Sequence, residues 1–289
     1  NVVGRWSDGE LHSPPTADET LTPGMILVAV GTPDSIRRLA EMARPLAREG
    51  PLVVLGFGDV GQKLAQVLTD AGEEVSELPR LRRTIAEHML RAKQTAAHVW
   101  TSVEVDYERV EQARRAQREQ FKAEEGFSLT YLPFIARATM DALAAYPVVN
   151  SSLDLEAGTR IDHKAVHLGI AVDLASQGLL VATVRDADGQ TLKRLARNIR
   201  AMAVKTRDGD ITPDEITGST FTITNPGPFG SFMSAPIINL PNVAILSTDT
   251  VAKRPAVVSL PDGTDTIAVR HIGYLGLTWD NRAFDGSTA

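Results

Sequence analysis

The sequence predicts an α+β fold from about residue 77 onward, preceded by a small α/β appendage. Strands are indicated by β-branched alternation at residues 220–224 and by a continuous apolar run at residues 272–277. A helix is indicated by Leu81, Ile85 and Met89, which recur at four-residue spacing. The two parts are distinguished by a change of sequence character after Val75.

Composition and charge exclude several classes of protein and site. A chain of 289 residues can hold one large or two ordinary domains. Without cysteine, it forms no disulfide and no thiolate metal site. The net charge of −6 gives no general attraction to nucleic acid or anionic lipid. No apolar run approaches the roughly 20 residues of a membrane span, and no signal peptide is evident, so we expect a cytoplasmic protein.

Residues 1 to about 39 are predicted to be rich in β-structure. A short buried strand is predicted at residues 25–31, and a helix is predicted to begin at Thr32-Pro33. Residues 21–31 resemble the C-terminal lobe of RCK domains, which regulate potassium transport. We therefore interpret residues 1–47 as RCK C-terminal-lobe-like.

Residues 48–76 carry a candidate nucleotide loop. A predicted strand runs into Gly56, Gly58 and Gly61, and a predicted helix follows, which is the context that a dinucleotide-phosphate loop requires. The next strand is stopped by Pro79, so the second half of a dinucleotide fold is missing. We interpret these residues as a partial Rossmann-like βα unit and expect no dinucleotide to bind, with NAD kept as the alternative cofactor.

The remaining segments follow in a regular order from residue 77 to residue 289. Helical and strand periodicities alternate along this region. The predicted elements are a helix at 80–89, a strand at 98–106, helices at 107–125, 131–145 and 192–205, and strands at 220–224 and 272–277.

Two polar motifs stand where predicted strands end. The first is Thr-Phe-Thr-Ile-Thr-Asn-Pro-Gly-Pro-Phe-Gly, at residues 220–230. The second is Asp-Asn-Arg-Ala-Phe-Asp-Gly, at residues 280–286. Polar side chains at the point where strands emerge into loops are well placed to line a functional site.

These motifs, with the segments between them, resemble the catalytic domain of the dihydrolipoamide acyltransferases over residues 77–289. That family forms the core of the 2-oxo acid dehydrogenase complexes, and its second motif reads Asp-His-Arg-x-x-Asp-Gly. The resemblance implies a coenzyme A-dependent acyltransferase fold, similar to chloramphenicol acetyltransferase, with a mixed sheet covered by helices on one side. The residues that match the second motif are Asp280, Arg282, Asp285 and Gly286.

The resemblance also implies the chemistry of the site. A histidine removes the proton of a thiol, the thiolate attacks a thioester, and a hydroxyl stabilises the oxyanion. By position, Thr224 supplies the hydroxyl, Asp285 holds the loop through a salt bridge, and Arg282 has a structural role. Asn281 stands where the family has its histidine, and an amide accepts no proton at neutral pH. We therefore expect impaired acyl transfer, which Asn281→His raises tenfold or more.

Further expectations concern substrates and partners. The resemblance implies coenzyme A and dihydrolipoamide as substrates, with the lipoyl group carried elsewhere because no Asp-Lys pair offers the acceptor lysine. It also implies a homotrimer that works with a 2-oxo acid decarboxylase and dihydrolipoamide dehydrogenase. The sequence ends three residues after Gly286. The family continues beyond this point, so we expect a truncated C-terminus that forms trimers but no closed cage.

Several alternatives stay open on the sequence. The acyl group could be of the pyruvate or the branched-chain type. Residues 1–75 could make the protein a nucleotide-sensing subunit of a potassium transporter, and Asn281 could mark a catalytically dead structural core. Thr224 could be an ordinary strand residue, and Asp285-Gly286 an ordinary turn. His163 and His167 have the spacing of a metal pair, but no third ligand is evident and we expect no metal site.

Overall fold

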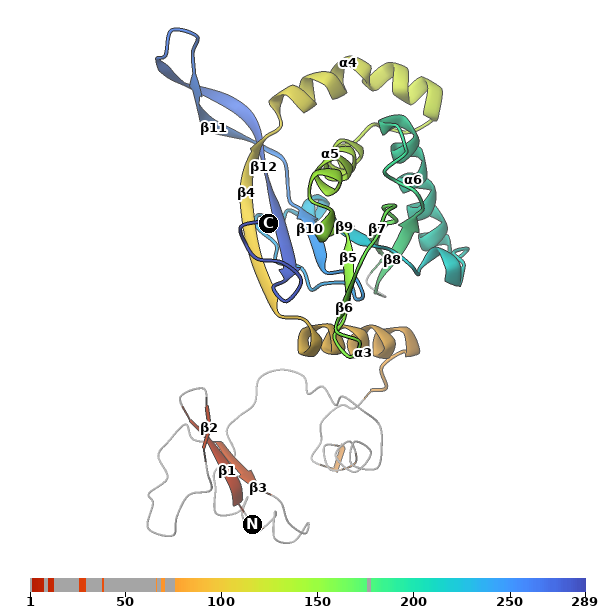
Figure 1. Ribbon diagram of the computed structural model, residues 1–289, viewed down its shortest axis with the longest axis vertical. Helices are drawn as coiled ribbons and strands as arrows, with labels where there is room; N and C mark the ends of the chain where they lie inside the picture. Colours follow the sequence, from red (N-terminus) through yellow and green to blue (C-terminus); the bar gives the residue numbers. More distant parts are fainter. Residues whose placement is uncertain are drawn as a thin grey trace. The chain divides into compact units, whose positions relative to one another are not determined.

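The computed structural model describes residues 2–7, 10–12, 26–29, 38, 66, 69–70, 76–175 and 178–289. The chain divides into two compact units, Asn1–Ser76 and Glu77–Ala289, which we treat separately (Figure 1). Within the described part, no helix is both long and apolar enough to cross a bilayer.

In the N-terminal unit the described strands form a small antiparallel sheet of order β2-β1-β3. Its strands are β1 (Val2–Ser7), β2 (Glu10–His12) and β3 (Ile26–Ala29). Strand β3 lies within the strand predicted at residues 25–31. The predicted helix start at Thr32 and the candidate nucleotide loop of Gly56, Gly58 and Gly61 lie outside the described residues.

The larger unit is built on a seven-stranded mixed sheet, as the α+β prediction requires. Strands β7, β9 and β10 run parallel to one another, and the other pairings are antiparallel. A separate hairpin pairs β5 (Ser151–Asp154) with β6 (Thr159–Asp162). The sheet strands are β4 (His98–Asp106), β7 (Leu168–Asp173), β8 (Leu179–Val184), β9 (Phe221–Thr224), β10 (Ala244–Thr248), β11 (Ala252–Ser259) and β12 (Asp265–Asp280).

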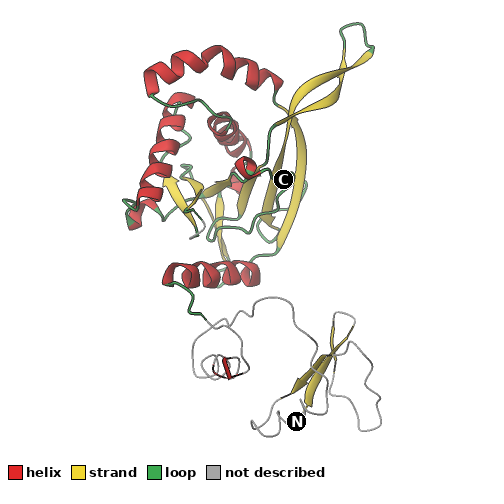
Figure 2. Cartoon of the chain, turned by 180° about the vertical axis from the view of Figure 1, so that it is seen from behind, coloured by secondary structure: helices red, strands yellow, loops and turns green. Residues whose placement is uncertain are grey.

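Helices α5 and α6 pack on one face of this sheet and form the main core with it (Figure 2). The core joins Met140 of α5 and Leu195 of α6 to the sheet residues Leu168, Phe221 and Trp279. The helices are α3 (Arg80–Thr95), α4 (Glu108–Glu125), α5 (Leu132–Ala145) and α6 (Leu192–Asp208), with short 3₁₀ turns at Pro147–Val149, Pro213–Glu215 and Gly227–Phe229.

Strand β12 extends well beyond the predicted run of residues 272–277. Its first half pairs with β11 alone, and these two strands form an arm that projects from the sheet (Figure 1). Its second half lies between β10 and β4. Only this second half is deeply buried, whereas Ile267 in the arm is 76% exposed. The apolar run therefore marked the buried half of the strand and not its full length.

Candidate active site

The turn after β12 is held in place by Asp280. The buried Asp280 carboxylate accepts the backbone N–H groups of Ala97, at 3.2 Å, and Arg282, at 3.1 Å. It also accepts the guanidinium of Arg282 at 2.7 Å. Burial raises the pKa of this carboxyl, but the hydrogen bonds from Arg282 and Ala97 outweigh that effect and leave it lowered. The residue between them, Asn281, donates its own backbone N–H to the Ala97 carbonyl at 2.9 Å.

Asp285 forms no salt bridge with any residue in the described part of the chain. The described ion pair of this loop joins Arg282 to Asp280, and the loop-holding role expected of Asp285 stays a prediction. Asp285 is exposed, and no described side chain pairs with its carboxylate. Its backbone carbonyl accepts the N–H of Thr288 at 3.0 Å.

The Asn281 side chain is exposed and makes one hydrogen bond. Its Oδ1 accepts the indole N–H of Trp279 at 3.3 Å. The other polar atom, Nδ2, has no partner among the described residues. The position that the sequence assigned to a base therefore presents an amide N–H₂ group.

Thr224 lies at the carboxyl end of β9. Its hydroxyl has no hydrogen-bond partner among the described residues. Phe221 and Ile223 point into the core beneath the helices. Strand alternation therefore directs Thr222 and Thr224 to the opposite face. Thr222 is fully buried there and donates to Asn242 Oδ1 at 2.6 Å, whereas Thr224 is only half-buried. Its hydroxyl is available to a ligand.

Strand register separates Thr224 from Asn281 within one chain. Thr224 lies opposite Ser247 of β10, and Ser247 lies opposite Gly276 of β12. Asn281 follows Gly276 by five residues, so the two positions lie roughly 17 Å apart along the strands. Within a single chain, Thr224 and Asn281 therefore lie at opposite ends of the sheet.

Two histidines each contact a polar side chain in a way that was not predicted from the sequence. His271 Nδ1 lies 2.7 Å from Glu108 Oε2, and this hydrogen bond lowers the pKa of Glu108. His163 Nε2 lies 2.8 Å from the Ser152 hydroxyl, and burial lowers the pKa of that imidazole. No local sequence signal could have found the first pair, because its members are 163 residues apart. Across the described ranges, no group of three His, Cys, Asp or Glu is arranged to hold a metal ion.

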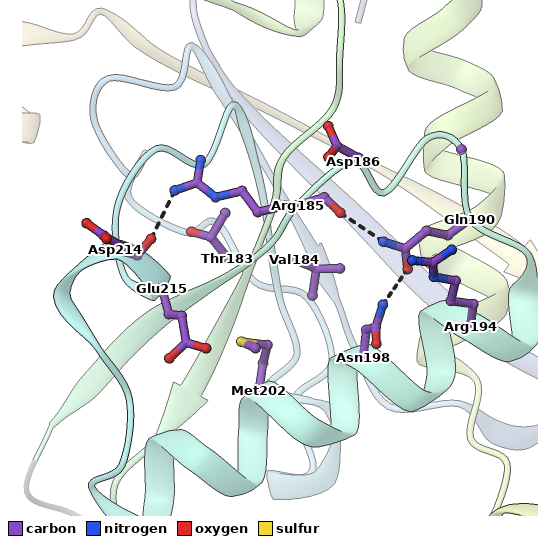
Figure 3. Close-up of a pocket in the computed structure, with 11 residues that line it drawn as sticks. Thr183, Val184, Arg185, Asp186, Gln190, Arg194, Asn198, Met202, Asp214 and Glu215 are labelled. Carbon is purple, nitrogen blue, oxygen red and sulfur yellow. Dashed lines mark hydrogen bonds between the residues drawn. The ribbon is translucent and has the colours of Figure 1, made fainter.

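Two cavities lie away from these positions. A polar one of about 570 Å³ opens between the end of β8 and α6, where Gln190 donates to the Arg185 carbonyl and accepts from Asn198 (Figure 3). An apolar one of about 560 Å³ lies between α5 and β12. Neither is lined by Thr224, Asn281 or Asp285. These two cavities therefore do not include the candidate site.

A comparison with known families covers both motifs. A family model described as the 2-oxoacid dehydrogenases acyltransferase (catalytic domain) matches residues 70–289. The chain belongs to this family. The match begins after the candidate nucleotide loop, so the RCK-like interpretation of residues 1–75 gains no support from it and stays a prediction.

Relatives within the family are similar in sequence over the same region. The acetyltransferase component of the pyruvate dehydrogenase complex of Mycobacterium bovis is 39% identical over 210 residues, which cover 73% of this chain and 38% of that protein. The lipoamide acyltransferase component of the branched-chain alpha-keto acid dehydrogenase complex of Bacillus subtilis is 38% identical over 217 residues, covering 75% and 49%. The chain thus spans at most about half the length of these two relatives.

Solved structures share the fold. A probable dihydrolipoamide acetyltransferase from Listeria monocytogenes superposes with a TM-score of 0.69 at 37% identity, over 75% of this chain and 90% of that one. The dihydrolipoamide acetyltransferase of Azotobacter vinelandii gives 0.69 at 32% identity, over 76% and 88%. The structure of the Azotobacter protein was determined to investigate the catalytic roles of a serine, a histidine and an asparagine. The α+β acyltransferase fold of residues 77–289 is thereby confirmed.

Proposed function

We propose that the protein transfers acyl groups between coenzyme A and dihydrolipoamide, as a core subunit of a 2-oxo acid dehydrogenase complex of the pyruvate or branched-chain type. The observation that carries the proposal is the Thr224 hydroxyl, which lies at the end of a family motif strand and has no hydrogen-bond partner among the described residues. The turn at the other family motif, which Asp280 holds through hydrogen bonds, also supports the proposal. In this proposal the partners are the decarboxylase and dihydrolipoamide dehydrogenase components of the same complex.

In the proposed reaction the sulfur of the attacking thiol forms a bond to the thioester carbon. The bond from that carbon to the departing sulfur then breaks, and a proton passes from the attacking thiol to the departing thiolate. Thr224 donates a hydrogen bond to the tetrahedral oxyanion between these steps. Asn281 holds no proton acceptor of useful basicity, so solvent must take the thiol proton. The transfer is slow for this reason.

We further propose that each site is built by two copies of the chain. Thr224 and Asn281 serve one reaction but lie roughly 17 Å apart along the strands of a single chain. A ring of copies that sets the Thr224 end of one sheet against the Asn281 end of the next resolves this separation. A homotrimer is the smallest such ring that the family resemblance supports.

The test is a transfer assay from acetyl-CoA to dihydrolipoamide with Thr224→Ala and the matched control Thr224→Ser. Without a base, we expect a native rate about 10²–10⁴-fold below that of a family member that carries the histidine. Thr224→Ala should lower this residual rate by a further factor of about 10–100, while Thr224→Ser retains most of it because the hydroxyl remains. Equal rates for native chain and Thr224→Ala, or no binding of acetyl-CoA in calorimetry, would contradict the proposal.

A further inference from the structure

The bond between Trp279 and Asn281 determines which way the Asn281 amide faces. An indole N–H can only donate, so the amide atom 3.3 Å away must be the oxygen. Trp279 is 3% exposed, and its N–H has no other partner in the described part of the chain. Flipping the amide would place N–H against N–H and leave the buried indole donor unpaired.

We propose that Trp279 is a positioning residue that fixes the hydrogen-bonding polarity of position 281, so that the group facing outward is a donor. The inference rests on the proposed function, in which position 281 lies beside the reacting thiol. An outward donor can hold the carbonyl oxygen of a thioester or a thiolate. It cannot take the proton of a thiol.

The same indole constrains a histidine placed at this position. In Asn281→His the imidazole Nδ1 can occupy the place of the amide oxygen, because the two side chains share their geometry as far as the γ-carbon and its substituents. Nδ1 then accepts the indole N–H, and the neutral ring carries its proton on Nε2. The outward nitrogen is again a donor. Restoring the histidine alone therefore gives a base in the wrong tautomer.

Rotation of the imidazole ring about the Cβ–Cγ bond would turn Nδ1 outward, but the indole of Trp279 disfavours that orientation. With the ring turned over, Nδ1 faces away from Trp279, but the buried N–H loses its acceptor. One buried hydrogen bond corresponds to roughly a tenfold preference against that orientation. The sequence predicts that Asn281→His alone raises the rate. The hydrogen bond from Trp279 implies that the indole N–H must be removed as well.

The experiment compares three variants of the full chain: Asn281→His, Asn281→His/Trp279→Phe, and the control Asn281→His/Phe284→Leu. Phe284 is buried and its ring stacks on Trp279 with centroids 6.2 Å apart. The control therefore loosens the same packing but keeps the indole donor. Nitrogen-15 NMR of histidine-labelled protein reports tautomer and pKa, and the native chain supplies the spectrum that lacks this imidazole. Thermal unfolding verifies that each variant is folded.

We expect the Nε2–H tautomer in Asn281→His and in the control, and a mixed population in Asn281→His/Trp279→Phe. The imidazolium has a proton on both nitrogens and conflicts with the indole N–H, so the imidazole pKa should be lower where Trp279 is retained. In the transfer assay, Trp279→Phe should add about tenfold to the rate of Asn281→His and shift its pH profile upward. The control should add nothing.

The same tautomer and the same imidazole pKa in all three variants would overturn the inference. The tautomer is measured without any turnover, which separates the two proposals. A tautomer that responds to Trp279→Phe in a chain that still transfers no acyl group would uphold the role of Trp279 and refute the proposed function.

Discussion

Glu111 of α4 is a buried, charged side chain. It is 3% exposed, and its carboxylate accepts hydrogen bonds from Arg114, Arg115 and the Tyr131 hydroxyl. The hydrogen bond from Arg114 is the largest influence on it, and the pKa of Glu111 falls to about 2. Burial raises the pKa of Tyr131 to about 12. Both groups therefore keep their hydrogen-bonding forms across the physiological range.

Replacing Glu111 should lower stability in a pH-dependent way. The folded pKa, about 2, lies below the ordinary value of 4.5, so the carboxylate stabilises the fold above pH 4.5. That contribution is lost as the pH falls from about 4.5 towards 2. We expect Glu111→Gln to lower the free energy of unfolding by about 2–4 kcal/mol at pH 7, because two arginines lose their partner.

Denaturant unfolding at pH 7 and pH 3 measures this difference. The gap between native chain and variant should narrow at the lower pH. Glu119→Gln is the matched control, because the Glu119 side chain is 86% exposed and its carboxylate pairs, among the described residues, with Arg118 alone. It should change stability by less than about 0.5 kcal/mol. A gap that is independent of pH would show that the carboxylate charge is not the source of the stabilisation.

In strand β12, the backbone of Ser234 lies close against Gly276. A Cβ at this residue would lie 2.5 Å from the Ser234 carbonyl oxygen, 2.7 Å from Ser247 Oγ and 2.9 Å from Trp100 Nε1. The Ser247 hydroxyl donates to that same carbonyl at 2.8 Å. The segment around Ser234 can lie across the sheet only because Gly276 has no side chain.

Gly276→Ala should therefore destabilise the protein, by about 2–3 kcal/mol, because backbone atoms must move to admit the methyl group. Chemical unfolding at neutral pH measures the loss. Gly189→Ala is the matched control, since a Cβ there meets only the Asp186 carbonyl, at 4.0 Å. Similar values for the two alanine variants would mean that the contact at Gly276 relaxes without cost.

At the scale of the whole molecule, the protein consists of two compact units. The larger unit has a hydrophobic core of its own. Among the described residues, the apolar side chains of the main cluster lie between Leu132 and Phe284. Residues Glu77–Ala289 should therefore fold alone, with a thermal midpoint within about 3 °C of the full chain. Calorimetry of the two proteins compares the midpoints. A fragment that fails to fold would show that the N-terminal unit stabilises the acyltransferase unit.

The separation of Thr224 from Asn281 leads to a prediction about assembly. If each site needs two copies, the transfer rate per chain should fall on dilution through the range where the oligomer dissociates. Sedimentation measurements and transfer assays over the same concentrations should give coincident midpoints. A dissociated single chain that keeps its full rate would contradict a site shared between copies.

Local sequence patterns were sufficient to predict most elements of residues 77–289. Strand β4 and helices α4, α5 and α6 begin within one residue of their predicted positions, because side-chain periodicity directly reflects which face is buried. The α+β class and the two motifs followed from such patterns and from the family resemblance.

The tertiary structure alone decided how these parts meet. The pairing of Glu108 with His271, the hydrogen-bond partners of Asp280 and Asp285, and the long arm of β12 depend on which segments become neighbours. Strand register determined that Thr224 and Asn281 lie at opposite ends of the sheet. Periodicity describes the surroundings of a residue along its own element. The distance between two elements is fixed by their alignment across the sheet, which no local pattern encodes.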